Sequence, residues 1–334
     1  MSSLRMHPQS CPLCAGMQIG LHRWFDVDAL KADWQKGFGF EPFSRLGIEG
    51  VVHQFRCFDC DLRFFDPATT LAGDGEFYNE LSSRFSWYYE KDKWEFDVAA
   101  EILAGLDGIE RVLEVGCGQG HFLVRIKNRY EVKGLEFNPQ AIVDCKAIGL
   151  DVTSDEMATL GEGSFDVVSA FEVLEHLPAP REFIEQSLRL LRPGGYLLFA
   201  VPDPEGYFTE AEKVLLDMPP HHVMGFSKKA FKCMEALFSL KLEQVHQEPL
   251  RFAHYRSYLG NFLAPPPPPR KPSFLDRVLY RLFGYQNEGD VELKRLGEKI
   301  TEMQMATSFQ NAKDKLVGQT HLVLLQKQQV LPLQ

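Results

Sequence analysis

The sequence lacks any long apolar run. Among its 334 residues the most apolar stretch is YLLFAVP at 196–202, far short of the roughly 20 residues that cross a bilayer. The amino-terminal MSSLRMHPQS also lacks the apolar segment of a secretion signal. We therefore expect a protein that has no membrane span and stays in the cytoplasm.

Positive charge is scarce as well. The chain has 36 Lys and Arg against 46 Asp and Glu, a formal net charge of −10, and no dense basic stripe. The basic segment RIKNRYEVK at 125–133 fits a solvated helix face. This balance argues against nucleic acid as the partner.

Cysteine is scarce too, but four of the seven cysteines form two pairs, CPLC at 11–14 and CFDC at 57–60. In a reducing compartment such pairs are more often metal ligands than disulfides. Four thiolates suit a closed structural zinc site, so Cys11, Cys14, Cys57 and Cys60 are the predicted metal ligands. Gly16 is expected to adopt the left-handed conformation that turns backbone amides towards sulfur.

The two pairs are unusually far apart. The 42 residues from Ala15 to Arg56 separate them, whereas a zinc ribbon usually has about 15 to 20. The intervening segment must therefore leave the module and return to it, and we expect this segment, more than the metal, to face substrate.

The composition divides the chain into five parts. They are a β-rich zinc-binding module (1–75), a helical aromatic link that covers the cofactor (76–108), a cofactor-binding core (109–250), a proline-rich and helical insertion (251–318) and a last strand (319–334). The insertion holds a stiff proline run at 264–272 and an apolar helical face at 273–285. That face is expected to pack on the main domain or on a second copy of the chain, which would make a homodimer.

The core alternates short apolar strands with amphipathic helices. RVLEVG, VKGLEF, FDVVSAF and GYLLFAVP read as strands, and the segments between them read as helices. This order predicts an α/β fold whose parallel sheet is covered on both faces.

The glycine-rich turn RVLEVGCGQG at 111–120 is the strongest ligand signal. Its glycines permit a tight turn and close approach of a ligand to a helix N-terminus. The spacing is G-x-G-x-G. The dinucleotide fingerprint G-x-G-x-x-G has its third glycine at the position that His121 occupies here. Glu114 precedes the loop, where a carboxylate suits a cationic ligand better than a pyrophosphate. These features favour S-adenosylmethionine over NAD.

Acidic residues follow the next two strands. Glu136, 20 residues after Gly116, can accept hydrogen bonds from ribose hydroxyls. Further on, Ser154, Asp155 or Glu156 could meet the adenine amine, and Asp155 is preferred.

The segments LEVGCGQGHFL, GLEFNP and SFDVVSAFEVLEHLPAPREFIEQSLRLLRPGGYLLFAVPD resemble the successive motifs of class I S-adenosylmethionine-dependent methyltransferases. The resemblance implies a Rossmann-like seven-stranded sheet with a reversed last strand, here THLVLLQKQ. It also implies a set of cofactor-binding residues around the methionine moiety, the ribose and the reactive end. The predicted set is Glu114, Gly116, Cys117, Gly118, Gly120, Glu136, Phe137, Asp155, Phe171 and Glu172, with Tyr88 and Tyr89 closing over the methionine end or serving as core aromatics.

Histidines supply the candidate base. Methyl transfer to a hydroxyl or a protonated carbon needs one, and histidine suits it near neutral pH. His221 and His222 in MPPHHVMGFS are the first candidates, and His176 in EVLEHLP is the second. The competing interpretation is a helix cap or packing contact for the pair and a structural or cofactor-side role for His176.

The predicted function is methyl transfer from S-adenosylmethionine to a small molecule or a glycan precursor, at oxygen or carbon. Methyltransferases with a cysteine knuckle ahead of the cofactor domain include enzymes that modify carrier-bound sugars and others that modify ribosomal RNA. An RNA methyltransferase is therefore the alternative, and a methyltransferase-like binding protein without catalysis is the third.

Overall fold

The computed structural model describes residues 8–206, 214–252, 254–255 and 303–328. The chain divides into two compact units, Met1–Glu248 with Thr320–Gln334, and Pro249–Gln319. Within the second unit, Phe252 and Tyr255 pack on Phe309 of a helix over 303–312. The proline run at 264–272 and the predicted apolar helix at 273–285 lie outside the described residues.

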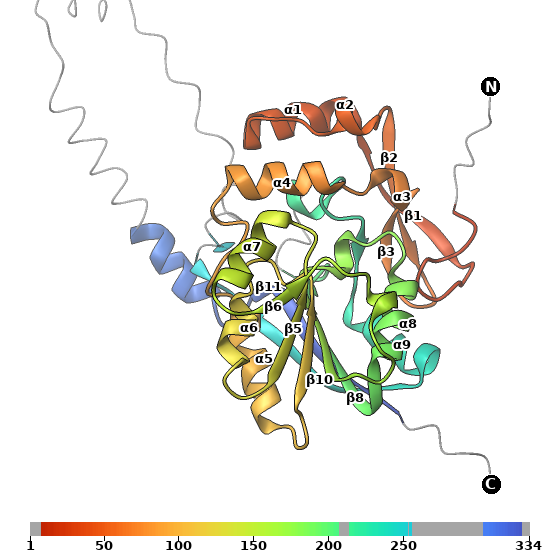
Figure 1. Cartoon of the computed structure of the whole chain (residues 1–334). Helices are drawn as coiled ribbons and strands as arrows, with labels where there is room; N and C mark the ends of the chain where they lie inside the picture. Colours follow the sequence, from red (N-terminus) through yellow and green to blue (C-terminus); the bar gives the residue numbers. More distant parts are fainter. Residues whose placement is uncertain (1–7, 207–213, 253, 256–302, 329–334) are drawn as a thin grey trace, which may run out of the picture. The chain divides into compact units, whose positions relative to one another are not determined.

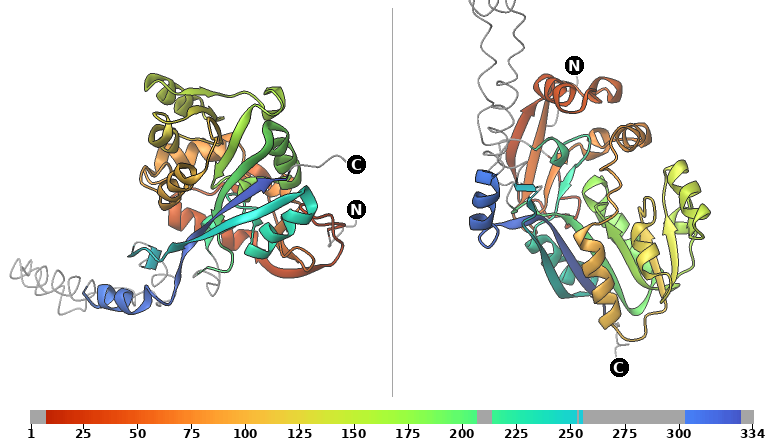
Figure 2. Two further views of the ribbon diagram at one scale, coloured as in Figure 1. Left: turned by 90° about the horizontal axis from the view of Figure 1, so that it is seen from below. Right: turned by 90° about the vertical axis from the view of Figure 1, so that its left-hand side faces the viewer.

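A seven-stranded sheet forms the centre of the first unit. Its order is β10-β11-β8-β7-β4-β5-β6, in which β4, β5, β6, β7 and β8 pair in parallel and β11 runs antiparallel to β8. The strands are β4 (Arg111–Val115), β5 (Glu131–Leu135), β6 (Asp151–Thr153), β7 (Phe165–Phe171), β8 (Leu191–Pro202), β10 (Leu240–Pro249) and β11 (Val317–Lys327). Figure 2 shows β11 in blue between β8 in green and β10 in cyan. The predicted fold class and the reversed last strand are confirmed.

The central strands are buried on both faces. All seven residues of β7 are buried, and successive side chains enter two different clusters of the core. Val168 and Ala170 belong to the first cluster, whereas Val167 and Phe171 belong to the second. This alternation follows from the two-residue period of a strand, and burial of both faces fits the largely apolar sequence of the segment, in which Asp166 and Ser169 are the polar residues.

Helices cover each face of this sheet. Apolar residues of α5 (Trp94–Gly105), α6 (His121–Ile126) and α7 (Pro139–Ala147) fill the second cluster. Those of α8 (Pro180–Leu190) and α9 (Lys228–Phe238) fill the first. Figure 1 shows α5 and α6 on the opposite side of the strands from α8 and α9. Capping side chains fix two of the starts, because Asn138 and Ser227 accept from amides of the first turn.

The amino-terminal module is a second sheet of order β1-β2-β3-β9 with antiparallel pairing. Its strands are β1 (Ile19–Asp26), β2 (Val51–Cys57), β3 (Arg63–Asp66) and β9 (Met224–Gly225). The predicted strands VVHQFRC and LRFFDP correspond to β2 and β3. Strand β9 follows the His221–His222 pair in the chain, so the module's sheet is completed by the segment that carries the candidate base.

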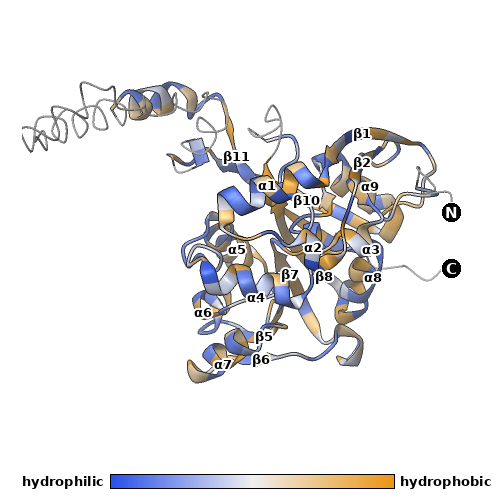
Figure 3. Ribbon diagram, turned by 90° about the horizontal axis from the view of Figure 1, so that it is seen from above, coloured by the Kyte–Doolittle hydropathy of each residue, from blue (hydrophilic) through white to orange (hydrophobic). Residues whose placement is uncertain are grey.

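The segment between the cysteine pairs is structured. It forms β1, helix α1 (Val27–Phe38) and the short helix α2 (Phe43–Leu46). Asp26 caps α1 by accepting from the amide of Ala29, and Gly39 ends it at a φ of 75°. Both hydrophilic and apolar residues appear along α1 in Figure 3. Its buried Trp34 ring lies 5.6 Å from the ring of Phe77, which joins α1 to α4.

The helical link predicted at 76–108 is interrupted. It consists of α4 (Gly75–Arg84) and α5 with an aromatic turn between them. Helix α4 ends where Phe85 leaves it to pack on Phe38 and Trp87. The turn then presents Tyr88 and Tyr89 towards the glycine loop and the histidines, as described below.

The remaining short helices are α3 (Ala68–Leu71), η1 (Met157–Thr159), η2 (Leu174–His176) and η4 (Leu215–Asp217). Across the part of the chain that the structure describes, no helix is both long and apolar enough to cross a membrane.

Candidate active site and metal centre

The glycine loop joins β4 to α6 as predicted. The amides of Gly116 and Cys117 donate to the carbonyl of Leu135 on the neighbouring strand, at 2.8 and 3.1 Å. Gly118 has a φ of 52°, and a Cβ there would lie 2.9 Å from the Tyr89 ring. Tyr89 therefore covers the loop closely, and its expected contact with the cofactor stays a prediction. Cys117 is buried beneath the loop.

Glu136 organises this loop. One carboxylate oxygen accepts from the amide of Gly118 at 2.7 Å, and the other accepts from Phe137 and Asn138 at 2.8 Å each. A carboxylate offers about four acceptor sites, so three backbone donors leave room for about one further hydrogen bond. The predicted contact with a ribose would share the carboxylate with these amides.

The other predicted adenosine contacts are exposed. The Phe137 side chain is 77% exposed beside Glu136. Asp155 follows β6 and accepts from the Thr153 hydroxyl at 2.9 Å. Both lie at the carboxyl ends of adjacent parallel strands, where this type of sheet binds ligands, and their roles stay predictions.

Three glutamates lie in or directly after two central strands, Glu114 in β4 and Glu172 and Glu175 after β7. Glu114 is 2% exposed and its Oε2 has no hydrogen-bond partner. Burial raises the pKa of Glu114 and of Glu175 well above the ordinary value. Burial, with nearby Glu95, raises the pKa of Glu172 to about 8. A cation placed among these groups would favour their ionised forms.

Lys93 is the cation that this part of the chain itself supplies, and sequence reasoning missed it. Its Nζ lies 3.6 Å from Oε1 of Glu95. Burial opposes its charge, but Glu95 and the neighbouring glutamates raise its pKa above the ordinary value. One ammonium faces several buried acids, which leaves the region able to accept further positive charge.

The backbone after β7 is strained. Glu172 has a φ of 55°, an uncommon conformation for a residue with a side chain. Its amide donates to the carbonyl of Ala200 at 2.8 Å. Phe171, predicted to contact the cofactor, has its ring 4.8 Å from the ring of Phe122 and is 5% exposed. Its side chain is therefore a core residue.

The three candidate bases come together, although His176 is 45 residues from His221. The ring centroids of His176 lie 4.7 Å from those of His221 and of His222, and the latter two rings stack at 4.3 Å. Each ring offers a nitrogen within 4.8 Å of the others. Burial lowers the pKa of His176 to about 4 and that of the other two well below the ordinary value, so all three are neutral at pH 7.

Their hydrogen bonds define the tautomers. Nδ1 of His176 lies 2.6 Å from the carbonyl of His221, and Nδ1 of His221 lies 2.8 Å from the carbonyl of Leu216. Carbonyl oxygens only accept, so each of these nitrogens carries the hydrogen and each Nε2 keeps a lone pair. Nδ1 of His222 lies 3.1 Å from Oδ1 of Asp217, which as a carboxylate imposes the same tautomer.

A tyrosine pair connects this histidine cluster, His176, His221 and His222, to the glycine loop. The Tyr88 ring lies 6.1 Å from His221 and 5.2 Å from Tyr89. Val173 touches the loop from the other side, since a Cβ on Gly116 would lie 2.6 Å from its Cγ2. Tyr78, which sequence reasoning missed, donates to the carbonyl of His221 at 3.3 Å.

A cavity of about 90 Å³ opens beside His222 and Asp217. Arg23, Phe25 and Gln54, which lie between the cysteine pairs in sequence, line it together with Arg63. The amino-terminal module therefore contributes a wall to the cavity at the histidine cluster.

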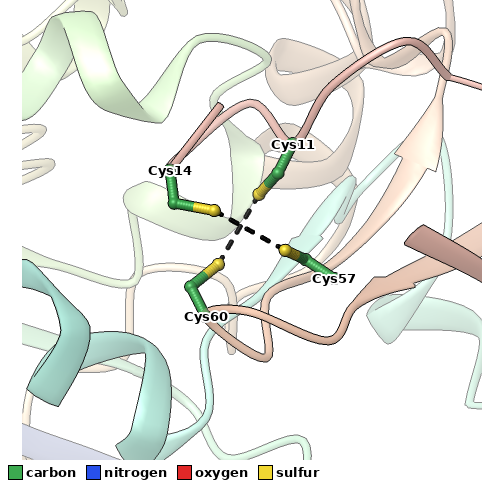
Figure 4. A group of neighbouring side chains, drawn as sticks. All are labelled: Cys11, Cys14, Cys57 and Cys60. Atoms are coloured by element: carbon green, nitrogen blue, oxygen red, sulfur yellow. Dashed lines mark hydrogen bonds between the residues drawn. The ribbon is translucent and has the colours of Figure 1, made fainter. Parts of the chain in front are cut away.

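The four cysteines converge from two similar loops (Figure 4). Sγ of Cys11 lies 3.6 Å from Sγ of Cys60, and Cys14 and Cys57 are also 3.6 Å apart. All four are free of disulfides. Sulfur atoms at the corners of a zinc tetrahedron lie about 3.8 Å apart, given Zn–S bonds of about 2.3 Å. The donor set and its spacing fit a zinc ion.

The prediction for Gly16 is wrong in one respect. The left-handed residues of the two loops are Ala15 at a φ of 58° and Asp61 at 72°. The Gly16 amide does donate to Sγ of Cys14 at 3.3 Å. A Cβ there would lie 2.2 Å from Oδ2 of Asp59 and 3.1 Å from Sγ of Cys14, so a side chain at this position would displace the exposed Asp59 carboxylate.

Comparison with known proteins identifies the family of the chain. A family model described as a methyltransferase domain matches residues 77–245, which is 169 of the 334 residues. The chain belongs to this family, and its strand order makes it a class I S-adenosylmethionine-dependent methyltransferase.

Relatives and solved structures can be described individually. A ubiquinone biosynthesis O-methyltransferase of Alkalilimnicola ehrlichii is 32% identical over 123 residues, 33% of this chain and 49% of that protein. The protein of the same name from Escherichia coli strain HS is 30% identical over 168 residues, 45% of this chain and 70% of that protein. The chain thus spans about half the length of the first relative. A methyltransferase from Archaeoglobus fulgidus has 19% identity and a TM-score of 0.44, and the match covers 76% of this chain and 100% of that one.

Proposed function

We propose that this protein transfers a methyl group from S-adenosylmethionine to a hydroxyl group of a small-molecule acceptor, a class that includes glycan precursors. The observation that carries the proposal is the histidine cluster, whose neutral imidazoles lie two aromatic rings away from the glycine loop. The names of the relatives, ubiquinone biosynthesis O-methyltransferases, support oxygen as the attacking atom.

We propose that the predicted cofactor-binding residues hold S-adenosylmethionine between Glu136 on one side and the carboxyl groups of Glu114 and Glu172 on the other. The buried, unpartnered Oε2 of Glu114 and the raised pKa of Glu172 both fit a cationic ligand. The cofactor supplies an activated methyl group on a sulfonium. The chain's task is then to align the acceptor, exclude water and assist removal of the hydroxyl proton.

The histidine cluster is proposed to assist that proton removal. Its Nε2 atoms carry lone pairs, and Nε2 of His221 is buried without a hydrogen-bond partner. An acceptor in the cavity beside His222 would be walled by Arg23 and Arg63. Asp203 and Asp217 line the same cavity, so it suits a polar acceptor that meets charges of both signs.

We further propose that Cys11, Cys14, Cys57 and Cys60 hold a structural zinc ion. Four sulfur ligands leave no open position, so this metal would stabilise the module without catalysis. Replacing Cys57 with serine should remove one zinc ion per chain and lower the melting temperature. Cys233→Ser should keep the zinc content and the melting temperature of the wild type. Equal zinc content in the two variants would contradict this assignment.

The test of the function is methyl transfer from isotopically labelled S-adenosylmethionine to a panel of hydroxylated small molecules, read by mass spectrometry. We expect one labelled methyl group on an acceptor oxygen, with turnover lowered at least tenfold in His221→Ala. His246→Ala, a change in β10 away from the cluster, is the control. Transfer to RNA, or no binding of S-adenosylhomocysteine, would refute the proposal.

A further inference from the structure

The histidine cluster has an arrangement that a base does not require. In all three rings, Nδ1 faces an oxygen: the carbonyl of His221, the carbonyl of Leu216 or the carboxyl of Asp217, whose pKa burial raises to about 7. A single base needs one such partner. Metal-binding histidines almost always use one ring nitrogen in this way, because the bond fixes the ring and makes the other nitrogen a better ligand.

Among the described residues, two groups of this cluster have no hydrogen-bond partner, the His221 Nε2 atom and the Glu175 carboxyl group, whereas the backbone of Glu172 contributes a hydrogen bond to His176. Nε2 of His221 is buried without a hydrogen bond. Nε2 of His176 and Nε2 of His222 each lie 3.8 Å from Oε1 of Glu175, and neither oxygen of that 1% exposed carboxyl group has a hydrogen-bond partner. Lone pairs thus face one another and a carboxyl group in a buried space. Such groups are costly to bury without a cation or proton donors between them.

We propose that His176, His221 and His222 bind a divalent transition-metal ion through their Nε2 atoms, with Glu175 beside it. Three neutral imidazoles suit Zn²⁺, Co²⁺, Fe²⁺ or Ni²⁺. Each ring offers one of its two nitrogens within 4.8 Å of a nitrogen of the others. Zn–N bonds of about 2.1 Å place tetrahedral nitrogen ligands about 3.4 Å apart, so the three rings would move closer together around the ion. This centre would bind its ion through nitrogen atoms, whereas the four-cysteine site would bind its ion through sulfur atoms.

A metal bound by three histidines leaves a coordination position open, as in catalytic zinc sites. The inference rests on the proposed function in giving that position to the acceptor's hydroxyl oxygen, which would reach it from the cavity beside His222. Coordination lowers the pKa of a bound hydroxyl group, so the acceptor would release its proton to solvent water in this cavity more readily before methyl transfer. The cluster's part in proton removal would then be to hold the metal.

The position of the two histidine segments supports a built site. His176 lies in η2 directly after the strained Glu172, and His221 and His222 lie between η4 and β9. The amide of Val223 donates to the carbonyl of Glu175 at 2.8 Å. The two segments are thus joined by their backbones next to the three rings.

The test counts metal ions in the full-length protein, without cofactor or acceptor. We expect wild type to hold two ions per chain by elemental mass spectrometry, and His222→Ala and His221→Ala to hold one each. His246→Ala should keep two. Circular dichroism and binding of S-adenosylhomocysteine verify that each variant folds.

Cobalt(II) substitution in the wild-type protein gives a second measurement that needs no variant. We expect ligand-field bands of a nitrogen and oxygen site in addition to the thiolate charge-transfer bands of the cysteine site. Only thiolate-site spectra, or a second ion retained in both histidine variants, would overturn the proposal. Two ions per chain without any methyl transfer would refute the proposed function and leave the metal site standing. Methyl transfer by a protein that holds one ion per chain would refute the metal site and leave the proposed function standing.

Discussion

Replacement of Glu136 by alanine tests whether the glycine loop is built to hold a cofactor. The carboxylate accepts from three backbone amides at 2.7 to 2.8 Å, and one of them belongs to Gly118 in the middle of the loop. Hydrogen bonds to charged groups contribute about 1.5–3 kcal/mol each, but water replaces part of that at a half-buried site. We assign about 2 kcal/mol to the ordering of the loop, and the proposed ribose contact is lost as well.

This loss predicts at least about 30-fold weaker binding of S-adenosylhomocysteine, because each 1.4 kcal/mol changes the dissociation constant about tenfold. Isothermal titration calorimetry measures it directly. Glu131→Ala is the matched control, since Glu131 is exposed at the start of the same strand. Equal affinity in Glu136→Ala and wild type would refute the role of Glu136 and the placement of the ribose.

Three further predictions concern the loop, the module and the acids. Gly120→Ala should cost about 1–3 kcal/mol in urea unfolding, because its φ is 72° and a Cβ would lie 2.4 Å from a buried leucine methyl group. Asp74→Ala should cost about 1 kcal/mol through loss of the α4 cap. Arg45 holds the pKa of Asp74 at about 2, so this stability is present above about pH 4 and is lost as the pH falls towards 2. For Glu172, whose pKa is about 8, ionisation above that pH should tighten binding of the sulfonium cofactor more than that of S-adenosylhomocysteine, and Glu172→Gln should abolish the difference.

Each has a result that would contradict it. Unchanged unfolding in Gly120→Ala would mean that the loop relaxes freely. An acid limb with the same slope in Asp74→Ala and wild type would remove the linkage argument. Affinities for the two cofactor forms that follow pH in parallel would show that Glu172 does not sense the sulfonium.

The sheet was predictable because its signals are local. The apolar strand of β7, the glycine turn after β4 and the apolar run of β11 each specify their structure within a few residues. The cysteine pairs were predictable for the same reason. The structure of the segment between the cysteine pairs was not predictable, because β1 becomes a strand by pairing with β2, which is distant in sequence.

The site was predictable residue by residue but not as an assembly. The adjacent pair His221 and His222 was chosen separately from His176, and nothing in the sequence indicates that His176 meets the pair. Tyr78 was missed because its partner, His221, is 143 residues away. Lys93 and Asp217 have partners nearby in sequence, Glu95 and His222, and were missed because only the fold shows that these pairs are buried. The left-handed Ala15 was missed because a positive φ at alanine depends on the knuckle around it, whereas glycine is favoured by its own flexibility.

The most direct test of the account is a crystal structure of the protein with S-adenosylhomocysteine. We predict that its ribose contacts Glu136, that its amino group lies towards Glu114 and that its sulfur faces the histidine cluster past Tyr88. Nucleoside bound elsewhere, or a sulfur atom pointing away from His176, His221 and His222, would contradict the central claim that these histidines line the site of methyl transfer.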